Sequence, residues 1–161
     1  MPDRIPPDLA LPADGDFTAL ANALRGGFEH TLGLSFTRVT LDEVCCTVPV
    51  TPALHQPYGL VHGGVYASII ETICSTGAGI RATIDGRSAV GLDNATRVLR
   101  GTREGTLHAR AVPQHQGRRT HLWAAEVHDD QGRLVAAGSV RMLIVDPGEG
   151  VGGATVRLPG T

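Results

Sequence analysis

The stretch "LVHGGVYASIIETICSTGAG", residues 60–79, constrains the fold of this chain more than any other part of the sequence. It is the most apolar window, yet it carries one carboxylate, Glu71, with no basic residue before Arg81 to pair with it. If residues 64–80 form a helix, the large apolar side chains share one broad arc. They are Val65, Tyr66, Ile69, Ile70, Ile73 and Ile80. We therefore expect a helix that packs this arc against a sheet.

Glu71 belongs to the opposite arc of this helix, where its neighbours are small. They are Ala67, Ser68, Ser75 and Ala78. A solvated helix face usually carries several charged residues, whereas small side chains let a ligand or a second backbone approach closely. Periodicity alone leaves two interpretations open: a functional acid in a confined place, or a partly exposed glutamate on a helix rich in glycine and alanine.

Two glycines, Gly63 and Gly64, stand where this helix should begin. The first N–H groups of a helix lack intrahelical partners and lie at the positive end of the helix dipole. Such N–H groups can bind an oxyanion, and a carboxylate two turns further on could activate a water or attack a carbonyl directly. The alternative is that the double glycine only turns the chain.

The composition limits the classes of partner. The chain has 161 residues and a formal net charge of −2, so we expect one globular domain and no nucleic-acid partner. The apolar window could span a bilayer by its length, but His62 and Glu71 would be costly there, so we expect no membrane association. No secretory signal opens the chain, and the three cysteines and seven histidines show no disulfide or metal spacing. These features predict a cytoplasmic protein without a metal site.

The pattern along the chain predicts its organisation. Residues 1–16 are expected to form a flexible leader, 17–146 a single domain and 147–161 a flexible C-terminal tail. Apolar residues at helical spacing predict a short N-terminal helix over 17–30. Period-two patterns predict two strands before the long helix and four after it: 34–41, 43–50, 89–99, 105–115, 120–128 and 133–145. This order predicts an α+β fold, with a curved antiparallel sheet around one buried helix.

Four positions keep a fixed spacing around the lone acid. They are Gln56, fifteen residues before Glu71, Gly63, eight before it with His62 directly ahead, and Ser75, four after it. On this pattern the sequence resembles the hotdog-fold acyl-CoA thioesterases, in the branch of phenylacetate-degradation and 4-hydroxybenzoyl-CoA thioesterases. In that branch the corresponding positions hold a Gln or Asn, a glycine N–H, the catalytic acid and a Ser or Thr. The order of elements agrees over roughly residues 30–146.

The resemblance implies an antiparallel sheet wrapped around the helix, in homodimers that commonly pair into tetramers, with each active site shared across the dimer. It implies hydrolysis of an acyl-CoA to free acid and CoA, without a cofactor beyond the CoA of the substrate. The Gly63 N–H would stabilise the oxyanion, and Glu71 would be the general base or the nucleophile. Gln56 would orient the carbonyl or the attacking water, and His62 could assist at that oxygen. Ser75 would hydrogen-bond to the Glu71 carboxylate or to the water.

Other residues are candidates for substrate contacts. Arginines at strand ends and turns could meet the CoA phosphates, although solvated charge is the default for any one of them. They are Arg100, Arg103, Arg118 and Arg119, with Thr120 closing the "GRRT" turn. In the strand over 89–99, alternation groups Asn94 with Val90 and Leu92 on an apolar face, where Asn94 would contact a ligand or a neighbouring backbone group. Tyr58 would line the acyl pocket or pack beside its turn.

Two other functions share the hotdog fold. Dehydratases of 3-hydroxyacyl thioesters begin the helix with a proline–glycine pair about five residues before the acid. Here the glycines lie seven and eight residues before Glu71, and no proline directly precedes them. A non-catalytic module that binds acyl-CoA as a regulator would normally carry an added DNA-binding segment, and residues 1–16 are too short for one. For a thioesterase, the sequence leaves aromatic, short-chain and medium-chain acyl groups open as substrates.

Overall fold

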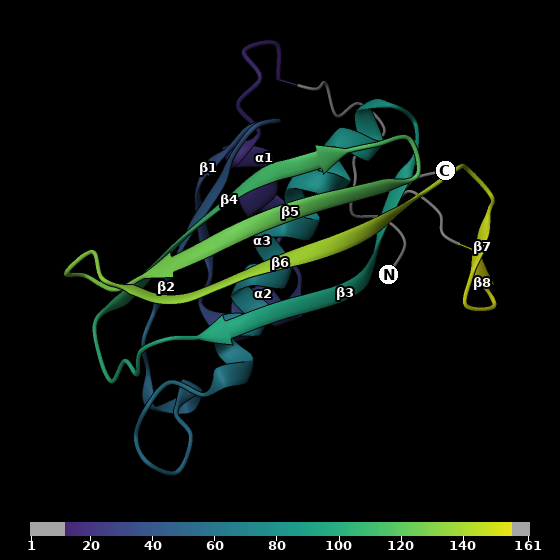
Figure 1. Ribbon diagram of the computed structural model, residues 1–161. Helices are drawn as coiled ribbons and strands as arrows, with labels where there is room; N and C mark the ends of the chain where they lie inside the picture. The colour runs from purple at the N-terminus through teal and green to yellow at the C-terminus, as the bar shows by residue number, and fades with distance from the viewer. Residues whose placement is uncertain (1–11, 156–161) are drawn as a thin grey trace.

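A six-stranded antiparallel sheet wraps around one long helix, α3 (Figure 1). The computed structural model describes residues 12–155. In sheet order the strands run β1–β2–β4–β5–β6–β3, and every neighbouring pair is antiparallel. This arrangement confirms the predicted α+β class and the hotdog fold.

The helices are α1 (Thr18–Ala23), α2 (Gly27–Leu32), the 3-10 turn η1 (Pro52–Leu54) and α3 (Gly63–Ile84). The strands of the large sheet are β1 (Ser35–Val39), β2 (Val44–Pro49), β3 (Ser88–Val98), β4 (Thr106–Gln116), β5 (Thr120–His128) and β6 (Leu134–Val145). Helix α3 begins one residue earlier and ends four residues later than predicted. No helix within residues 12–155 combines the length and the apolar character needed to cross a membrane.

Helix α3 fills the concave side of the sheet. Its three central isoleucines are fully buried, as the helical spacing predicts: Ile69, Ile70 and Ile73. Each contributes about 1.5–3 kcal/mol by its burial. Ala78 was predicted on the open arc, but it is fully buried, because the sheet curls around the helix and strands β2 to β6 all contact it. Gly77 accommodates the Trp123 indole of β5, since a Cβ at position 77 would lie 2.4 Å from that ring.

The single helix predicted over 17–30 is wrong, because two short helices occupy this segment. Gly26 separates them with an extended backbone, and the Glu29 carboxylate accepts a 2.9 Å hydrogen bond from the Gly26 N–H. This capping interaction starts a new helix in a new direction. Phe17 is buried in the core, whereas Phe28 is 57% exposed. The break therefore removes Phe28 from the apolar face on which the helical spacing had placed it.

Strand β3 is an edge strand that pairs only with β6, and it contains a bulge at Leu92. Gly91 lies opposite Met142, whereas Asp93 already lies opposite Arg141, so Leu92 is an extra residue in the ladder. A bulge reverses the inward and outward alternation beyond it. The predicted grouping of Val90, Leu92 and Asn94 on one face is therefore wrong. Several large side chains on and after this edge are exposed: Leu92 49%, Val98 48% and Leu99 57%.

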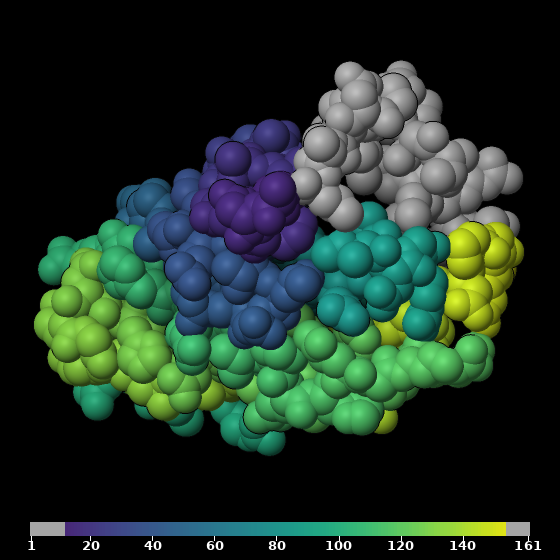
Figure 2. All heavy atoms as spheres, turned by 90° about the horizontal axis from the view of Figure 1, so that it is seen from above, coloured from purple at the N-terminus to yellow at the C-terminus, as the bar shows by residue number. Residues whose placement is uncertain are grey.

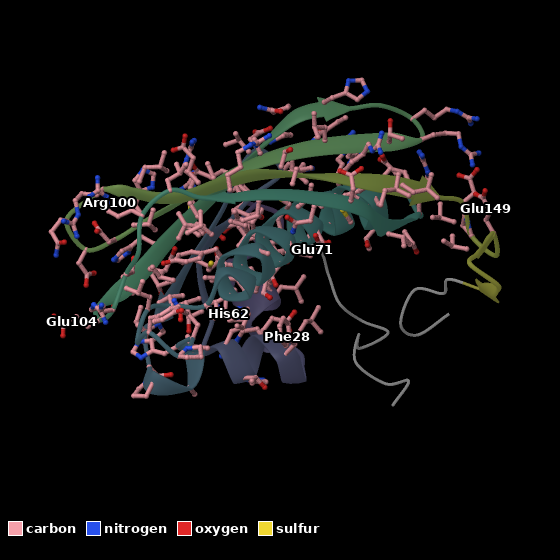
Figure 3. The ribbon with its side chains drawn as sticks, turned by 60° about the horizontal axis from the view of Figure 1, so that its bottom comes forward. Phe28, His62, Glu71, Arg100, Glu104 and Glu149 are labelled. Carbon is pink, nitrogen blue, oxygen red and sulfur yellow. The ribbon has the colours of Figure 1, made fainter. Side chains whose placement is uncertain are left out.

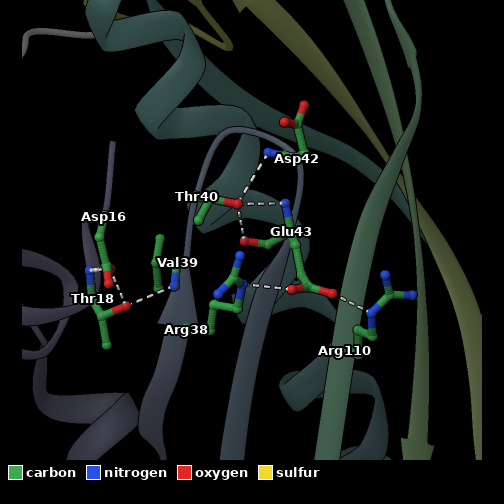
Figure 4. A network of polar contacts seen from close by, with 8 residues as sticks. All are labelled: Asp16, Thr18, Arg38, Val39, Thr40, Asp42, Glu43 and Arg110. Carbon is green, nitrogen blue, oxygen red and sulfur yellow. Dashed lines mark hydrogen bonds and ion pairs between the residues drawn. The ribbon is translucent and has the colours of Figure 1, made fainter. Parts of the chain in front are cut away.

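Polar contacts tie the first two strands to β4 (Figure 4). The Glu43 carboxylate bridges two arginines, with 2.8 Å to Arg38 Nε and a second bond from Arg110 Nε. The hydrogen bond from Arg110 lowers the pKa of Glu43, because it favours the charged carboxylate. On the other side of β1, the Thr18 hydroxyl accepts a 2.8 Å bond from the Val39 N–H, so α1 is fastened to the sheet.

The two ends of the chain lie partly outside the described residues, namely at 1–11 and 156–161. Within the predicted flexible tail, β7 (Gly150–Val151) and β8 (Ala154–Thr155) form a small hairpin, drawn in yellow in Figure 2. Glu149 precedes this hairpin and accepts a 3.0 Å bond from Arg119 of the β4–β5 turn. Helix α1, in purple, contacts β1, in blue, in the same view. Ordered structure thus continues beyond the domain end predicted at residue 146.

Candidate functional site

Glu71 lies half-way along α3 at the wall of a cavity of about 440 Å³ between α2, α3 and β3. The cavity is lined by Phe28, Ala67, Ser68, Glu71, Thr72, Asn94 and Thr96. Figure 3 labels Glu71 and Phe28 on the side of the sheet that holds the helices. Among residues 12–155 no arginine or histidine nitrogen lies within 4.0 Å of the Glu71 carboxylate. The acid thus lines a hollow without a countercharge.

Neutral groups of β3 hold this carboxylate. The Asn94 amide donates 3.0 Å hydrogen bonds to Glu71 Oε2 and to the Ala67 carbonyl of α3. The Thr96 hydroxyl donates a 2.7 Å bond to Asn94 Oδ1. Gly91 faces the other carboxylate oxygen, because a Cβ at this position would lie 3.0 Å from Glu71 Oε1. Asn94, predicted to contact a ligand or backbone, therefore contacts both the backbone and the acid itself.

Ser75 makes different contacts from those predicted. Its hydroxyl donates a 2.6 Å bond to the Glu71 main-chain carbonyl and approaches the Thr72 carbonyl at 3.2 Å. A serine inside a helix commonly bonds to the carbonyl four residues earlier. Of the two contacts predicted for Ser75, the one with the Glu71 carboxylate is wrong for this structure, because the hydrogen of the hydroxyl is already donated to the backbone, whereas the one with the attacking water stays a prediction.

The N-terminus of α3 forms a second candidate group. The His62 Nδ1 accepts a 2.9 Å bond from the Gly64 N–H, so the ring caps the helix and its proton resides on Nε2. The Val65 N–H donates to the His62 carbonyl at 2.9 Å. The exposed Gly63 N–H donates no hydrogen bond to any residue within 12–155. This leaves one free donor at the positive end of the helix.

The loop before α3 presents Gln56. Its side-chain Oε1 accepts a 2.7 Å bond from the Tyr58 N–H, and its backbone N–H donates to the Leu60 carbonyl at 2.8 Å. These bonds fix the side chain with its amide NH₂ as the remaining donor. The Arg103 guanidinium donates to the carbonyls of Tyr58 and Gly59 at 3.0 and 3.2 Å. Arg103 therefore supports this loop, and the Tyr58 side chain is 82% exposed rather than packed beside its turn.

These two groups do not meet within one chain. Gly63 and Glu71 are eight residues apart on a continuous helix, which separates them by roughly 12 Å along its axis. A single thioester carbonyl must lie about 3 Å from both an oxyanion donor and an attacking group. One chain therefore presents two separate groups: Gln56, His62 and Gly63 at the helix N-terminus, and Glu71 with Asn94 at its middle.

The candidate phosphate-binding residues also lie apart. Arg100 follows the end of β3. Arg118 and Arg119 form the β4–β5 turn, which lies next to the start of β3. Figure 3 shows Arg100 and Glu149, the partner of Arg119, at opposite ends of the sheet. Thr120 accepts a 2.9 Å backbone bond from Gly117 in the same turn. The four predicted arginines do not form one cluster in a single chain.

The three thiols of the described part of the chain are poor nucleophiles. Burial raises the pKa of Cys46 and of Cys74 to about 12, so both stay protonated near neutral pH. Desolvation by burial also raises the pKa of the Cys45 thiol. Residues 12–155 contain no group of three or more His, Cys, Asp or Glu side chains arranged to hold a metal ion.

Sequence reasoning missed three residues that line the cavity, Phe28, Thr72 and Thr96. Thr96 could have been found, because it follows Asn94 by two positions in a strand and so shares its face. Phe28 gave no such signal, because its helical spacing with Phe17 suggested a core position in one continuous helix. Only the break at Gly26 brings Phe28 to the cavity.

Comparison with known proteins identifies the family. The family model described as Thioesterase superfamily matches residues 58–136. The Mycobacterium tuberculosis protein Rv1847 is 40% identical over 117 residues, which cover 71% of this chain and 84% of that protein. The chain belongs to the thioesterase superfamily. Among other members, the proofreading thioesterase EntH of Cronobacter sakazakii is 38% identical over 117 residues, covering 73% of this chain and 84% of its own length.

Solved structures of thioesterase-superfamily proteins agree with the fold. The Rv1847 structure superimposes with a TM-score of 0.74 at 39% identity, covering 75% of this chain and 98% of that one. The thioesterase HI1161 of Haemophilus influenzae gives a TM-score of 0.73 at 28% identity, covering 79% and 88%. Membership of the superfamily and the thioesterase names of these relatives support a hydrolase of thioesters.

Proposed function

We propose that this protein is an acyl-CoA thioesterase that hydrolyses an acyl-CoA to the free acid and CoA. The observation that carries the proposal is the Glu71 carboxylate, which lines a 440 Å³ cavity with no arginine or histidine of residues 12–155 beside it. A hydrolase needs a base or nucleophile in this position, next to its acyl pocket. The spacing of Gln56, Gly63 and Glu71 supports the phenylacetate-degradation and 4-hydroxybenzoyl-CoA branch.

A second copy of the chain completes the site in this proposal. The β3 edge has an unpaired side and exposes Leu92, Val98 and Leu99, which is a surface that folded proteins normally cover. A twofold dimer joined along this edge would bring the α3 helices side by side. Glu71 of one protomer would then face the Gly63 N–H of its partner, which the 12 Å separation within one helix rules out in a single chain. Pairing of such dimers into tetramers is a further expectation.

The chemistry follows from these assignments. The Gly63 N–H polarises the thioester carbonyl, and the Gln56 amide NH₂ orients the carbonyl or the attacking water. In the general-base route Glu71 takes a proton from water, whose oxygen bonds to the carbonyl carbon. The tetrahedral oxyanion then collapses, the carbon–sulfur bond breaks, and the CoA sulfur leaves and is protonated. In the nucleophilic route the Glu71 oxygen bonds to the carbonyl carbon first, the carbon–sulfur bond breaks and the CoA sulfur leaves and is protonated; water then hydrolyses the resulting anhydride to the free acid and the Glu71 carboxylate.

The remaining parts of the substrate have candidate positions. The acyl group would enter the cavity beside Phe28, an exposed apolar residue that lines it together with Glu71. Since Arg100 and the Arg118–Arg119 turn lie at opposite ends of one sheet, CoA phosphates would meet only one of these groups. Arg118 is the better candidate of the turn pair, because Arg119 is paired with Glu149. All three cysteines are free thiols, which favours a cytoplasmic location.

Release of free CoA from a panel of aromatic, short-chain and medium-chain acyl-CoAs tests this function. Wild-type protein should release thiol, and Glu71→Gln and Glu71→Ala should lower kcat by roughly 10²- to 10⁴-fold. Glu126→Gln, an exposed change on the outer face of β5, is the matched control and should retain activity. Turnover that survives Glu71→Ala, hydration of an enoyl-CoA, or tight acyl-CoA binding without hydrolysis would each contradict the proposal.

A further inference from the structure

We infer that Asn94, oriented by Thr96 and presented by the bulge at Leu92, is the positioning residue for the Glu71 carboxylate. The inference rests on the proposed catalytic role of Glu71. It assigns to these β3 residues a function in holding the acid, not in contacting the substrate.

The bulge is what turns Asn94 toward the helix. Gly91 pairs with buried Met142 and Asn94 pairs with buried Val140, so both face α3 although they are three residues apart. In a regular strand, residues three apart point to opposite faces. The extra residue Leu92 shifts the inward and outward alternation of the side chains by one position. Bulges beside active sites are known to re-aim side chains in this way. Without it, Asn94 would point to the outer face of the sheet.

The hydrogen bonds of Asn94 use both hydrogens of its amide. One N–H is donated to the Ala67 carbonyl and the other to Glu71 Oε2, both at 3.0 Å. The Thr96 hydroxyl donates to Oδ1 at 2.7 Å, which fixes which end of the amide is the NH₂. An amide with both hydrogens donated has none left for a substrate. Its available function is therefore to hold the carboxylate.

This arrangement also fixes the rotation of the carboxylate. Oε2 is held by Asn94, whereas Oε1 faces Gly91, where a Cβ would stand 3.0 Å away. An attacking water or carbonyl carbon meets the same oxygen in the same direction only if the carboxylate keeps this rotation. A catalytic group that is misplaced by about 1 Å can lose roughly 10²-fold in rate.

Steady-state kinetics on the full-length protein test the inference, with the acyl-CoA that the wild type hydrolyses fastest. Asn94→Ala should lower kcat by roughly 30- to 100-fold with KM changed by less than about threefold, because the carboxylate loses its orientation but the substrate loses no contact. Thr96→Val, which keeps the shape and removes the hydroxyl, should lower kcat by about three- to tenfold, and Thr96→Ser should restore it. Ala95→Ser, on the outward face between them, is the control.

A double variant shows whether Thr96 acts through Asn94 or independently of it. If Thr96 acts through Asn94, Asn94→Ala combined with Thr96→Val should be no slower than Asn94→Ala alone. A rise in KM at constant kcat, additive losses, or unchanged kinetics in both single variants would overturn the inference. The Thr96→Val and Thr96→Ser pair keeps the test decisive if Asn94→Ala does not fold. Glu71→Ala distinguishes failure of the proposed function from failure of the positioning role. If Glu71→Ala remains active, the proposed function fails. If Glu71→Ala is inactive while the Asn94 and Thr96 variants keep wild-type kinetics, only the positioning role fails.

Discussion

Gly91 of β3 lies directly in front of the Glu71 carboxylate of α3, so close that a Cβ at position 91 would stand 3.0 Å from Oε1. A methyl group there must push the acid away or shift the edge strand by a few tenths of an ångström. We predict that Gly91→Ala lowers kcat by about tenfold and leaves the thermal midpoint within about 3 °C, since one methyl on an edge strand perturbs little else. Gly79→Ala, which adds a methyl group in open space on α3, is the control. Unchanged turnover in Gly91→Ala would show that nothing reacts at Oε1.

Phe28 should determine which acyl groups are accepted. The ring lines the cavity beside Glu71, yet it is 57% exposed and contributes little to the core. Phe28→Ala should therefore lower kcat/KM for aromatic and medium-chain acyl-CoAs by about tenfold, the effect of losing roughly 1.4 kcal/mol of apolar contact. Acetyl-CoA, which is too short to reach the ring, should be hydrolysed at an unchanged rate. An equal loss for every acyl length would place the acyl group elsewhere.

Two glycines of α3 should respond in opposite ways to the same substitution. A Cβ at Gly77 would lie 2.4 Å from the buried Trp123 ring, whereas a Cβ at Gly79 meets nothing within 4 Å. Gly77→Ala should lower the free energy of unfolding by about 1–3 kcal/mol through overpacking. Gly79→Ala should raise it by up to about 1 kcal/mol, because alanine favours the helix. Denaturant unfolding measures both, and equal stability of the two variants would contradict the packing.

The Glu43 bridge gives a pH-dependent contribution to stability. The Arg110 hydrogen bond lowers the pKa of Glu43 below its ordinary value of 4.5, so the stabilisation is present above that value and is lost as the pH falls through the lowered pKa. Because the arginines are about 60% exposed, we expect Glu43→Gln to lower the thermal midpoint by only about 1–3 °C at pH 7. The difference from wild type should shrink below about pH 4. A constant difference from pH 7 to pH 3 would contradict this origin.

The long helix, the sheet and the acid could be predicted from the sequence because their periodicity is strong and local. Ile69, Ile70 and Ile73 repeat at helical spacing and are all buried. The two halves of the proposed site were also visible, since Gly63 and Glu71 stand out by residue type. That the site is shared across a dimer was implied only by the resemblance to hotdog-fold thioesterases, and it stays a prediction.

The contacts of the acid could not be predicted, because they depend on backbone irregularities that carry no clear pattern. A period-two reading of β3 passes over the bulge at Leu92, and it therefore wrongly groups Val90 and Leu92 with Asn94 on one face. Gly26 breaks the N-terminal helix and sends Phe28 to the cavity rather than the core. Ser75 bonds to its own helix, a local choice that spacing from Glu71 cannot reveal.

Mixing two inactive variants tests the shared site most directly. Glu71→Ala and Gln56→Ala should each lose at least about 10²-fold in turnover when made alone. Co-expressed in equal amounts, the two chains should regain about a quarter of the wild-type turnover, because a twofold dimer that takes Glu71 from one protomer and Gln56 from its partner forms intact sites at that frequency. A mixture that stays as inactive as either variant alone would show that both residues act within one chain, or that the site is elsewhere.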